Sequence, residues 1–176
     1  MTRFSFIVVQ FFLLFNSLGA QSLKVKCVQK ERKITGGEDP IIVRTCFIKN
    51  FKFLEISIPD YAGRYSDSVD EVYVLVNNKY VKTSNANVFH NHQRELLSVI
   101  NNQIQKDFKE DLSDSTIKDC FVDFDSIPKY KMSDFTISIQ DGEIWFKVEW
   151  GLPSACRGVD GTIVSFKISE IQRYIR

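Results

Sequence analysis

The chain has 176 residues, and its 23 Lys and Arg residues nearly balance its 22 Asp and Glu residues, for a formal net charge of +1. A surface on which both signs are mixed and nearly cancel provides no electrostatic basis for binding nucleic acid or an anionic membrane. The length corresponds to one ordinary domain, which can bury a substantial core without depending on cross-links.

The N-terminal segment has the three parts of a secretory signal peptide. Arg3 precedes an apolar run over residues 4–15, and a short exit of mostly small residues follows up to Ala20. The run is too short for a membrane-spanning helix, which needs roughly 20 apolar residues. We therefore expect residues 1–20 to be a signal peptide. We expect residues 21–176 to be a single domain that is secreted or periplasmic and has no membrane span.

Four cysteines follow this segment: Cys27, Cys46, Cys120 and Cys156. An even number in an exported protein indicates two disulfides, and three pairings are open. We favour Cys27–Cys46 and Cys120–Cys156, because each bridge joins segments within one half of the chain. A metal site is the alternative, but the chain has no Cys-x-x-Cys pair and both histidines lie far from every cysteine in sequence. We expect no metal and no cofactor.

The first half of the mature chain is expected to be β-structure. The expected elements are a strand over residues 22–28, a turn over 34–40, one or two strands over 41–59, a loop over 60–70 and a hairpin over 71–83. The hairpin is expected to turn at Asn77 and Asn78, since asparagine is favoured at the positive φ angles of two-residue turns.

Residues 91–112 carry the periodicity of a long amphipathic helix. Asn91 is the expected N-cap of this helix. One face has apolar residues at three- and four-residue steps: Leu96, Leu97, Ile100, Ile104, Phe108 and Leu112. The opposite face carries Gln, Lys, Asp and Glu and is expected to be solvated.

A second hairpin is expected over residues 134–150, with its turn at Asp141 and Gly142. A third strand is expected over residues 161–168, and a short terminal helix begins at Ser169, which has Gln172 three positions later as in a capping box. The chain is therefore an α+β protein, in which an antiparallel sheet packs against one long helix and a short C-terminal helix follows.

No set of residues in the sequence forms a recognisable catalytic centre. His90 and His92 stand at the entry of the long helix, where an exposed position explains them without a metal. Asp123 and Asp125 would point the same way on a strand and could then act as an acid and base pair, although a solvated strand face explains them equally. The chain is therefore more consistent with a binding protein than with an enzyme.

Trp145 is the most informative candidate for a binding residue. If Trp150 faces the core, the alternation of a strand turns Trp145 to the other side, where an outward tryptophan is a typical contact residue. Packing under the long helix or under a loop is the alternative. Pro153 and Arg157 lie in the loop 151–158 that follows. A bridge at Cys156 would hold that loop still and lower the entropy cost of binding.

Residues 88–176 resemble the extracellular domain of the RsiV-type anti-sigma factors, which sense lysozyme. The matching positions are Ile100, Asn101, Ile104 and Phe108, then Phe135, Ile137, Gly142, Ile144, Phe146 and Val148, then Pro153 and Gly158, and finally Val164, Phe166, Ile168, Ile171 and Tyr174. The resemblance implies the same fold and a ligand-binding side at the loop. There "WGLPSACRG" departs from the family's "YEIAPYA.G" by having Ser154 in place of a tyrosine and an added cysteine.

We therefore expect an exported, non-enzymatic binding domain whose protein partner is lysozyme or another hydrolase or envelope protein. The expected contact residues are Trp145, Pro153 and Arg157. Because neither a membrane helix nor a sigma-binding segment is expected, the chain is not itself expected to be an anti-sigma factor. The alternatives are a periplasmic immunity or inhibitor protein that neutralises a toxin, and a secreted cell-wall hydrolase that uses Asp123 and Asp125.

Overall fold

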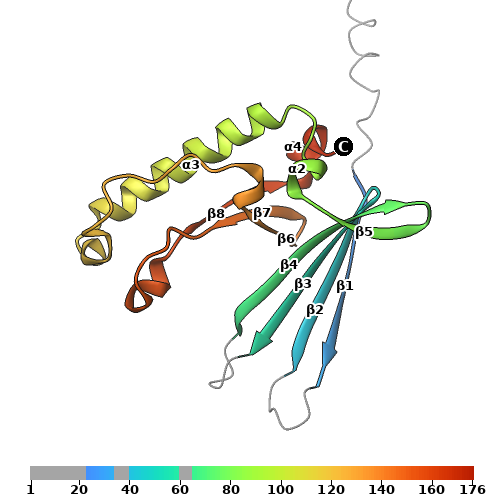
Figure 1. Ribbon diagram of the computed structural model, residues 1–176, viewed down its shortest axis with the longest axis horizontal. Coiled ribbons are helices and arrows are strands. Elements are labelled where there is room, and N and C mark those ends of the chain that lie inside the picture. Colours follow the sequence, from blue (N-terminus) through green and yellow to red (C-terminus); the bar gives the residue numbers. More distant parts are fainter. Residues whose placement is uncertain (1–22, 34–39, 60–64) are drawn as a thin grey trace, which may run out of the picture.

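The described part of the chain contains a five-stranded sheet and a three-stranded sheet, both antiparallel, and one long helix. The computed structural model describes residues 23–33, 40–59 and 65–176, without the side chains of residues 65–69, 154 and 157. The expected signal peptide at 1–20 and most of the expected turn at 34–40 lie outside these residues. In Figure 1 the long helix runs along the three-stranded sheet, and the five-stranded sheet extends away from both.

The elements follow one another in a simple order along the chain. The five-stranded sheet contains β1 (Val25–Arg32), β2 (Ile41–Ile48), β3 (Phe51–Pro59), β4 (Tyr65–Val76) and β5 (Lys79–Thr83), paired in that order. The helices α2 (Asn85–Val88) and α3 (Gln93–Ser113) and the 3-10 helices η1 (Lys118–Phe121) and η2 (Met132–Asp134) follow. The three-stranded sheet contains β6 (Thr136–Gln140), β7 (Glu143–Val148) and β8 (Thr162–Lys167), with the 3-10 helix η3 (Ser154–Val159) before β8 and the helices α4 (Ile168–Ile171) and η4 (Gln172–Tyr174) after it. The α+β fold class is confirmed.

Both expected hairpin turns are present with the expected backbone angles. Asn77 and Asn78 have φ values of 47° and 61°, and they join β4 to β5. Asp141 and Gly142 have φ values of 48° and 82°, and they join β6 to β7. Positive φ at both central residues matches the right-handed twist of the flanking strands, which is why these residue types stand here.

Three element boundaries differ from the expectation. The strand expected over 22–28 is β1, which begins at Val25 and continues to Arg32. The loop expected over 60–70 is wrong from Tyr65 onward, because β4 begins there and pairs with β3. The terminal helix begins at Ile168 rather than Ser169. Its N-cap is Lys167, whose N–H donates to the Glu170 carboxylate at 3.1 Å.

The start of α3 also differs from the expectation. Asn91 is not the N-cap; the helix begins at Gln93, after His92 takes a left-handed conformation with φ 49°. The Gln93 side chain donates hydrogen bonds to the carbonyls of Ala86 and Phe89, at 3.1 and 3.2 Å. These two bonds connect the first turn of α3 to α2 and its C-cap Phe89. The helix therefore begins one residue later than it would with Asn91 as the N-cap.

The core lies between α3 and the three-stranded sheet. The apolar face of α3 is buried through Leu96, Ile100, Ile104 and Phe108, as the periodicity predicted. Leu112, at the end of the same row, is exposed. Each large side chain buried here contributes roughly 1.5–3 kcal/mol.

An aromatic cluster closes one end of this core. Trp150 meets Phe108 and Phe121 edge to face, with ring centroids 5.6 and 5.5 Å apart. Asn101 holds the segment before β6 against α3, since its side chain donates to the Tyr130 carbonyl at 3.0 Å and accepts the Tyr130 N–H at 2.7 Å. Trp150 therefore belongs to the core, as expected.

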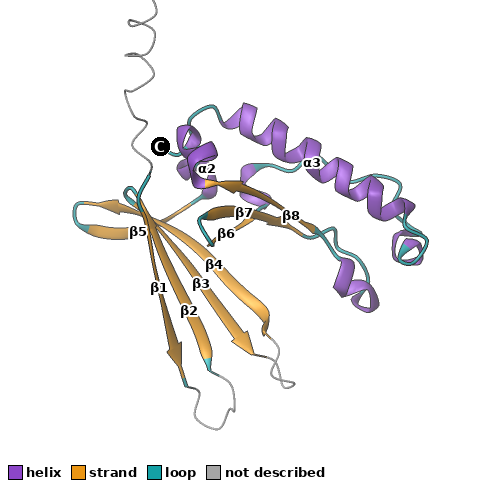
Figure 2. Cartoon of the chain, turned by 180° about the vertical axis from the view of Figure 1, so that it is seen from behind, coloured by secondary structure: helices purple, strands orange, loops and turns teal. Residues whose placement is uncertain are grey.

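The five-stranded sheet joins this core at one end only. β3 and β4 contact β6, and the Cys46 sulfur lies 3.9 Å from the carbonyl oxygen of Ile139. The buried residues of the sheet gather at this junction: Cys46, Ile48, Phe51, Phe53 and Val72. Figure 2 shows the strands fanning away from the junction. At their far ends, the residues of β2 and β3 are partly exposed on both faces.

Both expected disulfides are confirmed. Cys27 and Cys46 are directly opposite each other in the β1–β2 ladder, and their bridge attaches the edge strand β1 to the sheet. Cys120 and Cys156 join η1 to η3 across 36 residues of sequence. Within the described ranges, no helix is long and apolar enough to cross a membrane.

Candidate functional site

The two faces of the three-stranded sheet differ in what covers them. Ile144, Phe146 and Val148 of β7 are buried on the face that α3 covers. Trp145 and Lys147 lie on the opposite face, which we call the open face, and both are half-buried. Trp145 therefore does not pack under α3, so one of the two packing alternatives does not apply.

Trp145 occupies the centre of the open face. Its cross-strand neighbours are Ser138 on β6 and Ser165 on β8, so small side chains flank it on both sides. The next row of this face contains Thr136, Lys147 and Ile163. The Trp145 row is covered on the β6 side, where Ser138 is 1% exposed, and open on the β8 side, where Ser165 is exposed.

Two polar atoms on this face are covered from solvent. Trp145 Nε1 and Ser138 Oγ have no hydrogen-bond partner among the described residues. A buried donor without an acceptor costs roughly 1–3 kcal/mol. Trp150 Nε1 in the core shares this property, so it is not specific to the open face.

A cavity of about 830 Å³ adjoins the Trp145 row. It is lined by Tyr130, Asp134, Thr136, Lys147, Val148, Glu149, Asp160, Gly161, Thr162 and Ile163. Three carboxylates and one ammonium group stand on this lining, so the cavity carries an excess of negative charge. A partner that presents Lys or Arg side chains matches it electrostatically.

The phenol of Tyr130 lies among these charges. Burial raises the pKa of Tyr130, and the carboxylates of Asp160 and Asp134 raise it further. The phenol therefore stays protonated at neutral pH and can donate a hydrogen bond into the cavity.

Asp160 fixes the beginning of the loop 151–158. Its Oδ1 accepts the backbone N–H groups of Trp150, Gly151 and Leu152, at 2.9, 2.8 and 3.1 Å. Gly161, at φ 107°, passes so close to β7 that an added Cβ would stand 2.1 Å from the Val148 oxygen. Only glycine therefore fits beside Asp160.

The loop is also fixed at its other end. The Cys120–Cys156 bridge holds η3, and the Cys156 N–H donates to the Pro153 carbonyl at 2.7 Å. Pro153 is exposed, and Arg157 lies in η3, with its side chain outside the described set. Along the chain the cavity-lining stretch 147–149 lies between Trp145 and this loop, but neither Trp145 nor the loop 151–158 is part of the lining. The loop is connected to the lining through Asp160, which accepts the N–H groups of Gly151 and Leu152.

The residues considered for catalysis are not assembled into a site. His90 and His92 are exposed at the helix entry, and no metal-ligating cluster of His, Cys, Asp or Glu occurs among the residues that the structure describes. Asp123 and Asp125 are exposed in the turn after η1. They do not share a strand face, so the condition under which they could act as an acid and base pair is not met.

The sequence did not reveal the cavity, because its lining comes from separate segments that only the fold brings together. Tyr130 and Asp134 precede β6, whereas Asp160 precedes β8. A signal for Asp160 was present in its position directly before Gly161. An aspartate before a glycine is, however, typical of any turn.

Comparison with known proteins gives no relative: no protein-family model, no curated protein and no solved structure matches the chain.

Proposed function

We propose that the protein is an exported, non-enzymatic binding domain that holds a partner protein on the open face of its three-stranded sheet. Trp145 is the central contact, the acidic cavity receives basic side chains of the partner, and the loop with Pro153 and Arg157 forms the rim. The partner is lysozyme or another hydrolase or envelope protein.

The position of Trp145 carries this proposal. A tryptophan offers a large contact area and loses little conformational entropy, which is why tryptophans are enriched among the residues that dominate binding energy. Here the ring stands on the face opposite α3, between Ser138, which is buried, and Ser165, which is exposed. A tryptophan whose only role was to fill the core would be expected on the α3 side, where Trp150 lies.

The rigidity of the surroundings supports the same conclusion. The Asp160 carboxylate and the Cys120–Cys156 bridge hold the loop before any partner arrives. A loop that is already ordered loses less entropy on binding, so more of the contact energy contributes to affinity.

The RsiV-like resemblance fits this assignment. Most of the matching positions fall on α3, β6, β7, β8 and α4, which together form the unit built around the buried core. The loop that the resemblance assigns to the ligand-binding side is bonded through Gly151 and Leu152 to Asp160, which lines the cavity beside the open face. We propose on this basis that residues 88–176 are an RsiV-like extracellular domain that binds a lysozyme.

An immunity or inhibitor protein in the periplasm would use the same face and differ only in its partner. A cell-wall hydrolase gains no support, because Asp123 and Asp125 are exposed in a turn.

Calorimetric titration of the oxidised protein, residues 21–176, against a c-type lysozyme tests the proposal. We expect one-to-one binding, and Trp145→Ala should weaken it roughly 30-fold, as loss of a central aromatic contact does. Tyr80→Ala is the matched control, since Tyr80 is a partly exposed aromatic residue on the five-stranded sheet.

Two results would count against the proposal in different ways. Equal affinity of Trp145→Ala and the unsubstituted protein would remove the open face as the contact surface. Heat no larger than that of dilution would remove lysozyme as the partner, and envelope proteins and toxins would be titrated next.

A further inference from the structure

The outer edge of β8 differs from the other exposed edges of the two sheets. β8 pairs only with β7 in the described part of the chain. Exposed edges normally carry charges that prevent another chain from adding to them. β1 has Lys26, Lys30, Glu31 and Arg32, and β5 has Lys79 and Lys82, whereas "TIVSFK" of β8 has only Lys167 at its end. β6, the other edge of the three-stranded sheet, has no charged residue either, but it contacts β3 and β4.

The backbone of β8 has hydrogen-bonding groups directed at this edge. Ile168 N–H donates to the Gly142 carbonyl at 3.1 Å, so residue 168 faces β7. In an antiparallel ladder this orientation alternates, which turns the N–H and C=O groups of Ile163 and Ser165 away from β7. The N–H groups of Ile163 and Ser165 bond to no other described residue.

A groove of about 720 Å³ runs beside the same edge. On the sheet side it is lined by Ile163, Val164, Ser165 and Phe166. Successive residues of a strand point to opposite faces, so a groove that touches four in a row lies alongside the strand and not above one face.

The other wall is one stripe of α3. Its residues are Val99, Asn102, Gln103, Lys106 and Asp107, at the three- and four-residue spacing of a single helix face. Eight helical steps from Val99 to Asp107 cover about 12 Å, and three strand steps from Ile163 to Phe166 cover about 10 Å. The two walls therefore have similar lengths.

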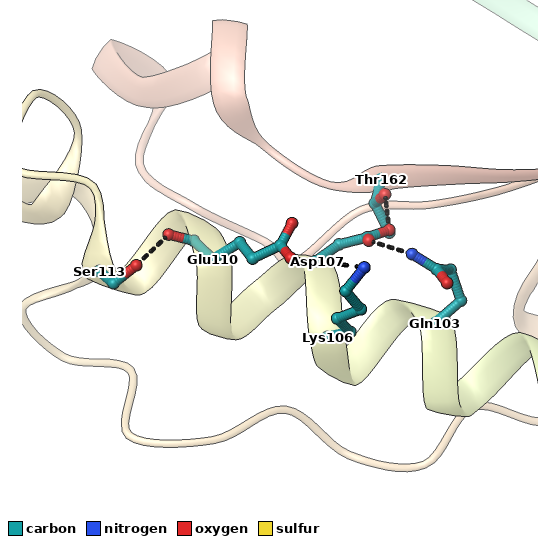
Figure 3. A network of polar contacts seen from close by, with 6 residues as sticks. All are labelled: Gln103, Lys106, Asp107, Glu110, Ser113 and Thr162. Carbon is teal, nitrogen blue, oxygen red and sulfur yellow. Dashed lines mark hydrogen bonds and ion pairs between the residues drawn. The ribbon is translucent and has the colours of Figure 1, made fainter.

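A polar network fixes the distance between the walls. Thr162 Oγ1 donates to Asp107 Oδ2 at 2.7 Å, and Gln103 Nε2 donates to Asp107 Oδ1 at 2.6 Å. Figure 3 shows Asp107 reaching from α3 to Thr162 at the beginning of β8, with Lys106 and Glu110 beside it. The groove is thus formed before anything occupies it.

The geometry points to a peptide-binding groove in which an extended segment of another protein adds to β8 as a fourth strand. Main-chain groups of the segment would bond the amides and carbonyls of Ile163 and Ser165. One alternate side chain would meet Val99 and Phe166 and is expected to be apolar. A side chain nearer Lys106 is expected to be polar or acidic.

A single strand fits this groove better than a second copy of the chain. A two-fold pairing of β8 with β8 would bring the α3 stripes of both copies together. Apart from Val99 that stripe is polar, and it lacks the apolar area that a helix interface requires. The segment is expected to contain about six residues, because β8 has six.

The probe for this groove is a display library of linear seven-residue peptides, selected on the oxidised protein. The strongest peptide is then synthesised and titrated against the unsubstituted protein, Val99→Lys and Val81→Lys. Val99 and Val81 are 47% and 52% exposed, so the two variants are matched, but Val81 lies on β5. We expect Val99→Lys to weaken binding more than tenfold and Val81→Lys to leave it unchanged.

Amide hydrogen exchange provides a readout that side-chain contacts alone would not change. In the free protein the amides of Ile163 and Ser165 should exchange quickly, and those of Val164 and Phe166 slowly. The peptide should slow Ile163 and Ser165 specifically.

Three results would overturn the inference. They are a selection that enriches no peptide, a peptide that binds without protecting Ile163 and Ser165, and free protein that is a dimer in which both amides are already protected. The lysozyme titration of Trp145→Ala concerns the open face, so its outcome does not decide this test.

Discussion

The unit formed by α3 with the three-stranded sheet and the five-stranded sheet are stabilised in different ways. In the first, most of the apolar side chains of α3 and β7 are buried between two layers. In the second, burial is concentrated where β3 and β4 meet β6, and the far ends of the strands are held by cross-strand pairing and the Cys27–Cys46 bridge. The comparison indicates that the first unit carries most of the stability.

The largest effect should come from breaking the core of the first unit. Trp150→Ala removes the ring that meets Phe108 and Phe121, and should lower the free energy of unfolding by about 3–5 kcal/mol. Denaturant unfolding followed by circular dichroism measures this loss. A change below about 1 kcal/mol would mean that the aromatic cluster contributes little to the fold.

Removing one disulfide at a time tests the stability of each region individually. Loop entropy predicts losses of about 4 kcal/mol for Cys120→Ala with Cys156→Ala and about 3 kcal/mol for Cys27→Ala with Cys46→Ala. Hydrogen exchange should show that the second pair of substitutions exposes β1 while α3 keeps its protection. If α3 lost protection equally, the two regions would be one cooperative unit.

Asp160 tests how firmly the binding loop is held. Asp160→Ala removes the acceptor of three backbone N–H groups and should cost about 2 kcal/mol, whereas Asp160→Asn keeps an acceptor and should cost less. The difference between the two unfolding free energies is the measurement. Equal losses would mean that charge and not hydrogen bonding decides.

The smallest effect concerns the five-stranded sheet. Lys82 and Tyr73 both donate to the Glu71 carboxylate and hold its pKa below the ordinary 4.5. A lowered folded-state pKa stabilises the protein above the unfolded value, and this stability is lost as the pH falls through the folded value. Stability measured from about pH 5 downward should therefore fall less steeply in Glu71→Gln. Identical slopes would contradict this assignment.

The sequence predicted those features that depend on local pattern. Alternation and Asp141-Gly142 identified the second hairpin, the three- and four-residue period identified α3, and both disulfide pairs were correct. The first six residues of β4, "YSDSVD", were predicted to be a loop because they show no clear alternation. Their pairing with β3 makes them part of the strand.

The site was predictable only in part. Alternation predicted that Trp145 and Trp150 face opposite sides of the sheet. The cavity beside Trp145 depends on Tyr130, Asp134 and Asp160, which the fold brings together from separate segments. The free edge of β8 follows from sheet order, and a single sequence contains no local signal for which strand lies at an edge.

The central claim is that the two tryptophans of one hairpin have opposite roles, one in the core and one for contact. The most direct measurement is the free energy of unfolding of Trp145→Ala in guanidinium chloride, compared with Trp150→Ala. We expect Trp145→Ala to lose about 1 kcal/mol or less, with an unchanged denaturant slope. A loss of about 3 kcal/mol or more, as expected for Trp150→Ala, would place Trp145 in the core and contradict the claim.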